Sequence, residues 1–394
     1  MQLDWLTSQV PDGDQVVTVV LDATRDSEHG YQAVLTRWRD IRRSLEGRGV
    51  ATPTLDHIDE QIRVPTHVAG KHGRVLVVSP NGVVIDRVLA QPPVADAGTL
   101  GIDPFALASV ADDTVAYLLA EIDRTGADLT LQQHALMEYE AGDELDSVEG
   151  EHDVINKVRR AGMASRRLQS RAEDSWERNA ETVAGELSRI VSERHPELLL
   201  LTGDVRAVSL VRERLSTEAA AIATVLDGGS RSAGVNEQAF DRKLGEALDI
   251  FRAQRREEVL DRFRQEEGRE GTATQSVDDV VTALARGQVE ELIVRLDSVG
   301  PNSALRRRTL WVGDSPMQLG TTAEVVADLG VAEPREVQAE LAIGRAAAEQ
   351  SAGITLVDEA SIDLANGLGA LLRWRDAATP KEHAFKYSGD TSRT

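Results

Sequence analysis

The sequence contains no cysteine, so disulfides, thiolate chemistry and cysteine-based metal sites are excluded. It also lacks any apolar run that approaches the roughly 20 residues needed to cross a bilayer. The first residues, Met1 to Trp5, have neither the basic region nor the apolar core of a signal peptide. These absences favour a cytoplasmic protein that has no membrane partner.

Basic residues are also scarce: 44 lysines and arginines stand against 66 aspartates and glutamates, and the formal net charge is −22. This excess of acid argues against broad binding of nucleic acid, because contacts to phosphates depend on lysine and arginine. An acidic protein that binds RNA must therefore do so at a restricted basic patch. With 394 residues, the chain is long enough for two or three domains, each with a core of its own.

Several catalytic and ligand-binding motifs are absent as well. There is no GxxxxGK[ST] phosphate loop and no GxGxxG after a strand, and the eight histidines form neither HExxH nor another ligand set. No Ser-His-Asp arrangement can be assigned, and we expect no cofactor and no metal. Asp22, Asp123 and Asp204 each end a predicted strand, where a carboxylate either binds a metal, as in an RNase H-like domain, or serves as a turn or cap residue.

The densest basic segment runs from His152 to Arg171 and contains six lysines or arginines and one acid, Asp153. It follows an acidic run from Glu138 to Glu151, which has seven carboxylates and no basic residue. We interpret the acidic run as a mobile flank, since its spacing does not match a calcium-binding loop. The basic segment is the natural candidate for a contact with RNA.

A long helix is predicted directly behind the basic segment, from about residue 165 to residue 194. Its apolar positions recur at steps of three and four: Leu168, Ala172, Trp176, Ala180, Val183, Leu187 and Ile190. The N-terminus of a helix favours anions, and Gly162 allows a close approach of the backbone to RNA. The segment is either a solvated loop or an RNA contact; in the second case the binding residues are His152, Lys157, Arg159, Arg160, Gly162, Met163, Ala164, Ser165, Arg166, Arg167 and Arg171.

Apolar periodicity predicts a mixed α/β chain of three domains, at 1–105, 106–230 and 231–380, followed by a flexible tail at 381–394. In the first domain we expect a strand at 16–22, helices at 31–47 and 54–63, a hairpin around Asn81-Gly82, and an extended linker from Pro92 to Pro104. In the second we expect strands at 115–122, 127–133 and 198–201 and helices at 165–194 and 206–217. In the third we expect helices at 236–265, from Ser276 and at 335–351, and strands at 292–296, 309–312 and 354–357.

Three short strings carry a resemblance to a known family. Gly162-Met163-Ala164-Ser165 before a basic amphipathic helix resembles the tip of the middle domain of archaeal and eukaryotic peptide-chain release factors, where Gly-Gly-Gln-Ser opens a long helix. The stretch from Val277 to Val294 resembles the third domain of those factors and of Pelota, and Gly367 to Trp374 resembles the ending of actinobacterial members of the bacterial branch. The resemblance covers roughly 110 to 375. It implies an RNase H-like middle domain and a C-terminal α/β/α sandwich.

The tip departs from the family pattern at the residues that carry the chemistry. In release factors the glutamine helps to position the water that hydrolyses peptidyl-tRNA. Met163 and Ala164 stand where the second glycine and the glutamine would be, and neither side chain can position a water by a good hydrogen bond. The resemblance therefore implies no catalytic residue and a protein that is not an enzyme.

Among the relatives, this combination is similar to the ribosome hibernation factors of the Balon group. That resemblance implies binding in the vacant A site of the 70S ribosome, contact with 23S rRNA near the peptidyl transferase centre and with the small-subunit decoding region, and association with elongation factor Tu. One alternative is a peptidyl-tRNA hydrolase that rescues stalled ribosomes, although the nearest glutamine, Gln169, lies a full turn inside the predicted helix. Another is a stress protein that never meets ribosomes.

Overall fold

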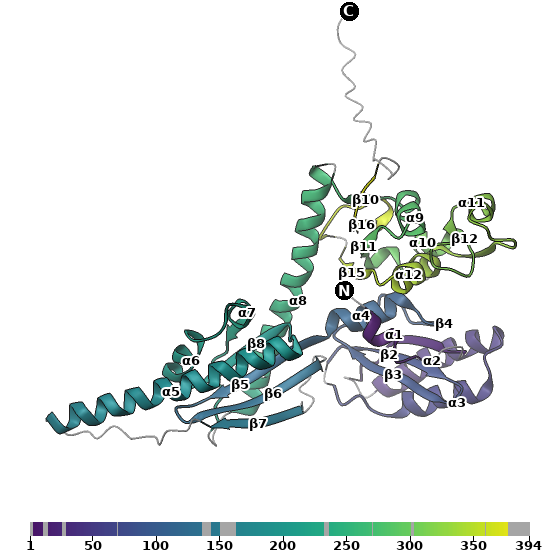
Figure 1. Ribbon diagram of the computed structural model, residues 1–394. Coiled ribbons are helices and arrows are strands. Elements are labelled where there is room, and N and C mark those ends of the chain that lie inside the picture. Colours follow the sequence, from purple (N-terminus) through teal and green to yellow (C-terminus); the bar gives the residue numbers. More distant parts are fainter. Residues whose placement is uncertain are drawn as a thin grey trace, which may run out of the picture. The chain divides into compact units, whose positions relative to one another are not determined.

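The computed structural model describes residues 3–10, 15–25, 29–68, 70–135, 143–149, 163–231, 236–269, 271–300, 303–358 and 360–376 (Figure 1). Contacts divide the chain into two compact units, one of residues 1–112 with 254–394 and the other of residues 113–253. The 32-residue helix α8 (Glu237–Gly268) begins in the second unit and ends in the first. The predicted division into three domains stays a prediction.

The N-terminal part of the first unit is an antiparallel sheet in the order β3-β2-β1-β4. The core lies between this sheet and α2 and α3, and is built from the apolar positions that the sequence predicted, including Val34, Trp38 and Leu45. Gly82 has a φ of 136°, which the tight hairpin turn requires and which a residue with a side chain rarely adopts. The elements are α1 (Asp4–Thr7), β1 (Val17–Asp22), α2 (Gly30–Gly47), α3 (Thr52–Arg63), β2 (Gly73–Ser79), β3 (Gly82–Leu89), β4 (Ala97–Leu100) and α4 (Pro104–Asp113).

The predicted extended linker from Pro92 to Pro104 is wrong, because this stretch contains the strand β4 and leads directly into the helix α4. The side chains of Ile41 and Leu45 fill the space beside Gly98, where a Cβ would lie 2.7 Å from Ile41 Cγ2. Strand β4 has only four residues, and it lacks the apolar alternation from which most strands are predicted. Helix α4 is buried on nearly every side, so its sequence shows no amphipathic period.

The C-terminal part of the first unit contains a four-stranded sheet in the order β10-β16-β11-β15. The end of α8 packs on one face through Leu260 and Phe263. Strands β11 and β15 are parallel, and α12 lies between them in the chain, as in a βαβ unit. The elements are β10 (Ala273–Gln275), α9 (Val277–Ala285), β11 (Val289–Arg295), η1 (Leu296–Ser298), α12 (Ala339–Glu349), β15 (Gly353–Val357), η2 (Ala365–Gly367) and β16 (Leu368–Leu372).

A smaller antiparallel sheet in the order β13-β12-β14 is inserted between β11 and α12. The predicted helix at 335–351 is therefore correct only from Ala339, because Arg335–Gln338 forms β14 against β12. The elements of this insertion are α10 (Ala304–Arg307), β12 (Thr309–Val312), β13 (Leu319–Gly320), α11 (Ala323–Asp328) and β14 (Arg335–Gln338).

The second unit is a five-stranded mixed sheet in the order β7-β6-β5-β8-β9. Helices α5, α6 and α7 pack on one face, and the first half of α8 packs on the other through Phe240, Leu244 and Leu248. The predicted α/β fold class is confirmed. The elements are β5 (Val115–Ile122), β6 (Gly126–Ala135), β7 (Asp143–Glu149), α5 (Met163–Arg194), β8 (Leu198–Gly203), α6 (Val205–Arg212), α7 (Thr217–Ala221) and β9 (Ala223–Val225).

Part of the acidic run forms a strand, which corrects its interpretation as a mobile flank. Residues Asp143–Glu149 pair with β6 as the edge strand β7, and Val148 packs against the core. Charged residues are usual on edge strands, where they discourage pairing with other chains. The predicted helix at 206–217 is also corrected, because α6 ends at Arg212. A separate helix, α7, begins at Thr217 and is capped by Ser216, which accepts a hydrogen bond from the N–H of Ala219.

Candidate functional site

The helix α5 positions the segment that the sequence singled out. It begins at Met163 and has 32 residues, which is about 48 Å of helix. Trp176, Ala180, Val183, Leu187 and Ile190 are all buried, so the predicted apolar stripe is confirmed from Trp176 onward. These side chains fix the second half of the helix on the sheet of the second unit (Figure 1).

The predicted RNA-binding residues fall into two groups. His152, Lys157, Arg159, Arg160 and Gly162 lie outside the described residues. The other six occupy the first turns of α5: Met163, Ala164, Ser165, Arg166, Arg167 and Arg171. Their contact with RNA stays a prediction.

Trp176 of α5 joins three elements. The residue is 4% exposed, and the guanidinium groups of Arg124 and Arg206 lie 4.5 Å and 5.4 Å from the centre of its ring. Arg124 belongs to the turn between β5 and β6, and Arg206 to the first turn of α6. The side-chain amide of Asn179, also on α5, donates a hydrogen bond of 3.0 Å to the backbone carbonyl of Arg124. Cation–π contacts and this hydrogen bond thus fix α5 to the ends of β5 and β8.

The strand-end aspartates act as turn and cap residues. One carboxylate oxygen of Asp204 accepts hydrogen bonds from the N–H groups of Arg206 and Ala207, and so caps α6. Asp22 likewise accepts from the N–H of Thr24 and pairs with Arg37 at 2.8 Å. These contacts agree with the interpretation of the strand-end aspartates as turn and cap residues. Within the described ranges, no group of three or more histidines, aspartates and glutamates could hold a metal ion.

The turn after β5 is held by Asp123 in the same way. One oxygen of its carboxylate accepts hydrogen bonds from the N–H groups of Thr125 at 2.7 Å and Gly126 at 3.0 Å. Partial burial acts to raise the pKa of Asp123, but the hydrogen bonds from Thr125 and Gly126 and the charge of Arg231 outweigh it, so this pKa is lowered. The carboxylate is therefore ionised at neutral pH and stabilises the turn that carries Arg124.

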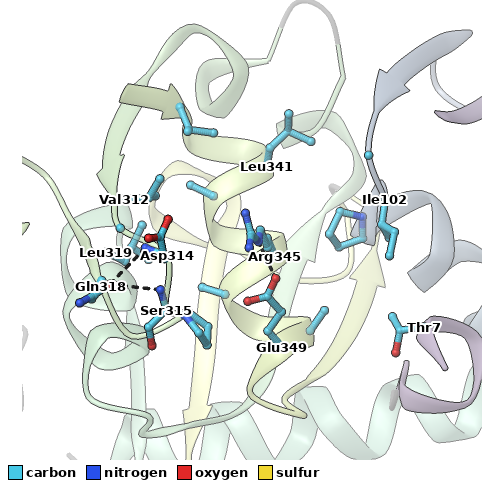
Figure 2. Close-up of a pocket in the computed structure, with 18 of the residues that line it drawn as sticks. Thr7, Ile102, Val312, Asp314, Ser315, Gln318, Leu319, Leu341, Arg345 and Glu349 are labelled. Carbon is cyan, nitrogen blue, oxygen red and sulfur yellow. Dashed lines mark hydrogen bonds and ion pairs between the residues drawn. The ribbon is translucent and has the colours of Figure 1, made fainter. Parts of the chain in front are cut away.

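A cavity of about 520 Å³ lies in the first unit, and no pattern in the sequence predicted it. Figure 2 shows its residues arranged around Arg345 and Glu349 of α12, with the β12–β13 hairpin on one side and Ile102 and Thr7 on the other. The lining comes from four parts of the chain: Thr7, Val10 and Val16, and residues within 100–104, 312–319 and 337–349. No local motif can reveal a site assembled in this way.

The described helices include none that is both long and apolar enough to cross a membrane.

Comparison with known proteins gives a family assignment for the second unit. The model of Bacterial archaeo-eukaryotic release factor family 2 matches residues 116–269. The chain is also 26% identical over 360 residues to two Mycobacterium tuberculosis proteins, Uncharacterized protein Rv2629 and Uncharacterized protein MT2704, with 91% of this chain and 92% of each relative covered.

Two solved structures align over nearly the full length at low identity. Dom34 of S. cerevisiae, a translation termination-like factor, is 8% identical with a TM-score of 0.40, over 96% of this chain and 94% of that one. Pelota of Archaeoglobus fulgidus is 12% identical with a TM-score of 0.34, over 95% of this chain and 92% of that one.

Over residues 116–269 this protein is similar to the bacterial archaeo-eukaryotic release factors of family 2, and this matched region covers most of the second unit and all of α8. The resemblance to release factors stated from the tip is thereby confirmed at the level of the family for the matched region, whereas the two C-terminal strings lie outside that region and stay a prediction.

Proposed function

We propose that this protein is a ribosome hibernation factor that occupies the vacant A site of idle ribosomes. Its basic segment, residues 152–171, contacts 23S rRNA near the peptidyl transferase centre, elongation factor Tu associates with it, and it releases no peptide. The observation that carries the proposal is that α5 begins at Met163, within a tip that has arginines around it and no glutamine.

The anchoring of α5 supports a tip that is presented at a fixed place. Trp176 lies 13 residues after Met163, which corresponds to about 20 Å along the helix. The buried part of α5 is fixed on the sheet by Trp176 and by the apolar positions that follow it. A tip on such a helix can reach into a narrow RNA-lined site without ordering the rest of the chain.

The charge distribution supports contact with RNA at that tip alone. The net charge of −22 repels phosphates over most of the surface, whereas six basic residues lie between His152 and Arg171. The first N–H groups of α5 add a partial positive charge at the same end. Binding should therefore fall as salt concentration rises, with a slope set by the few cations of the tip.

The side chains of the tip support occupancy without hydrolysis. Ala164 has no polar side-chain atom, and the thioether of Met163 is only a weak acceptor. Gln169 lies on α5, six residues after Met163 and about 9 Å further along the helix. The alternative function, a peptidyl-tRNA hydrolase, would have to use another group.

Sedimentation and peptide release together test the proposal. The purified protein should co-sediment with vacant 70S ribosomes and release no nascent peptide from stalled complexes above a buffer control. Arg166→Ala with Arg167→Ala should weaken binding and flatten its salt dependence by about one unit of slope per arginine.

A matched control comes from the same helix. Arg189 of α5 is half-exposed and paired with Glu186 and Glu193, so Arg189→Ala should leave ribosome binding unchanged. Peptide release by the wild-type protein would favour the hydrolase. Absence from the 70S fraction would favour the stress protein that does not meet ribosomes.

A further inference from the structure

The walls of the cavity in the first unit are fixed by close packing. Gly344 of α12 lies against the start of α4, where a Cβ would come within 3.1 Å of Pro104 Cβ and of the Phe105 ring. Two residues beyond the end of α12, the hydroxyl of Ser351 donates a hydrogen bond of 3.2 Å to the carboxylate of Asp4. The middle of α12 and the residue Ser351 after it therefore both contact the N-terminal part of the unit, and these contacts hold the walls of the cavity in place.

The hairpin wall is also held in one conformation. The side-chain carbonyl of Gln318 accepts hydrogen bonds from the N–H groups of Asp314 and Ser315, each at 3.1 Å. The N–H of Gly313 donates to the backbone carbonyl of Gln318 at 2.8 Å. The loop that borders the cavity is thus ordered by its own hydrogen bonds, as Figure 2 shows.

Most of the cavity is apolar, and one ion pair lies within it. The walls include Ile102, Val312, Leu319 and Leu341, and Leu100 is 48% exposed at its border. The Nε of Arg345 donates to one carboxylate oxygen of Glu349 at 2.5 Å. This contact leaves the guanidinium Nη groups as donors and the second carboxylate oxygen as an acceptor.

The charged groups around the cavity decide which kind of molecule it can bind. Arg345 is balanced by Glu349, and Asp314 at the loop is balanced by Arg335 at 2.8 Å. Phosphates and carboxylates would meet Glu349 and Asp314, whereas a cation would meet the two guanidinium groups. An amide group is uncharged and has one donor and one acceptor, so it can bond to both members of the Arg345–Glu349 pair.

We propose that this cavity binds a short, uncharged peptide segment of a partner protein, with apolar side chains against the walls and a main-chain amide on Arg345 and Glu349. Its volume of about 520 Å³ lies in the usual range of ligand pockets, about 300–1,000 Å³. This binding does not depend on the tip of α5 or on the ribosome. The partner's segment would be recognised by apolar side chains and hydrogen-bonded backbone rather than by charge.

The test uses the full chain and the probe N-acetyl-leucyl-leucinamide, with binding measured by calorimetry and by saturation-transfer NMR. The wild type should bind the probe saturably, and Arg345→Gln and Glu349→Gln should each weaken binding by about tenfold, since each removes a hydrogen bond to a charged group. Arg264→Gln should bind as the wild type does, because Arg264 pairs with Glu257 and Asp261 on α8, away from the cavity.

Two further measurements keep the proposal open to refutation. Leu100→Trp should block the border of the cavity and abolish binding while thermal unfolding stays unchanged, because Leu100 is half-exposed. The free acid N-acetyl-leucyl-leucine should bind more weakly than the amide. No saturable binding by the wild type, equal binding by the Arg345 and Glu349 variants, or tighter binding of the acid would each overturn the proposal and leave the ribosome-binding proposal untouched.

Discussion

The guanidinium of Arg124 lies 4.5 Å from the centre of the Trp176 ring, and one of its nitrogens also lies 3.0 Å from a carboxylate oxygen of Asp204. Arg124 therefore connects the β5–β6 turn, the helix α5 and the cap of α6 through one side chain. The contact lies on α5 about 20 Å from Met163 along the helix. The attachment to the sheet of the helix that carries the proposed RNA-binding tip should depend on this contact of Arg124.

Replacing Trp176 by alanine should destabilise the second unit. The substitution removes a nearly buried ring together with its contacts to Arg124 and Arg206, and such truncations cost about 3–5 kcal/mol. The free energy of unfolding, measured by urea denaturation followed by circular dichroism, should fall by that amount. Arg189→Ala on the same helix should change it far less, because its ion pairs are exposed. Equal effects of the two changes would show that Trp176 does not anchor α5.

Asp204 combines two roles that different substitutions can separate. Asp204→Ala removes the cap of α6 and should lower the free energy of unfolding by about 0.5–2 kcal/mol. Asp204→Asn keeps a good capping group and loses only the partly exposed ion pair with Arg124, so it should cost less than about 1 kcal/mol. Urea denaturation of both variants checks this order. A larger loss for the asparagine variant would contradict the assigned cap.

Glu340 should make the stability of the first unit depend on pH. Burial raises the pKa of Glu340, Arg306 at 3.7 Å acts to lower it, and the charge of Asp103 acts to raise it. Because this pKa is raised, the folded state binds the proton more tightly than the unfolded state. Protonation of Glu340 therefore adds to the stability of the folded state as the pH falls from the folded pKa to the ordinary pKa of a glutamate. This contribution is lost as the pH rises through the folded pKa.

The variant Glu340→Gln isolates this effect from the other carboxylates. At neutral pH it should unfold at a higher urea concentration than the wild type, since it removes a buried charge whose nearest cation is 3.7 Å away. The difference should shrink as the pH is lowered through the folded pKa of Glu340. A constant difference from neutral pH down to about pH 4 would show that this carboxylate is not protonated more easily in the folded protein.

Elements with a local repeating pattern were predictable from the sequence. Helix α2 and the buried stripe of α5 each bury a face whose spacing matches the period of a helix, and the hairpin follows from the turn residues Asn81-Gly82. Strands β4 and β14 were missed because their residues are not buried in alternation. Gly98 makes room for side chains of α2, and β14 is mostly exposed at the edge of a small sheet.

The two candidate sites also differ in whether a local pattern in the sequence predicts them. The tip could be inferred because its charges and its glycine are neighbours in the chain, although its contacts stay predictions. The cavity could not, since Ile102 and Arg345 come together only through the packing of α12 on α4. The roles of Asp123 and Asp204 could be assigned only from the structure, because an aspartate at the end of a strand can either bind a metal or stabilise a turn.

The proposed position of the tip predicts a gain of function. If the start of α5 lies in the peptidyl transferase centre, Met163→Gly with Ala164→Gln should place an amide side chain where release factors have one, and so allow a water to be positioned. This double variant should release peptide from stalled ribosome complexes at least about tenfold faster than the wild type. Ala164→Leu with Met163→Gly is the control, because leucine has a similar size but no polar atom. Tight ribosome binding by the double variant without any release would mean that the tip lies elsewhere on the ribosome.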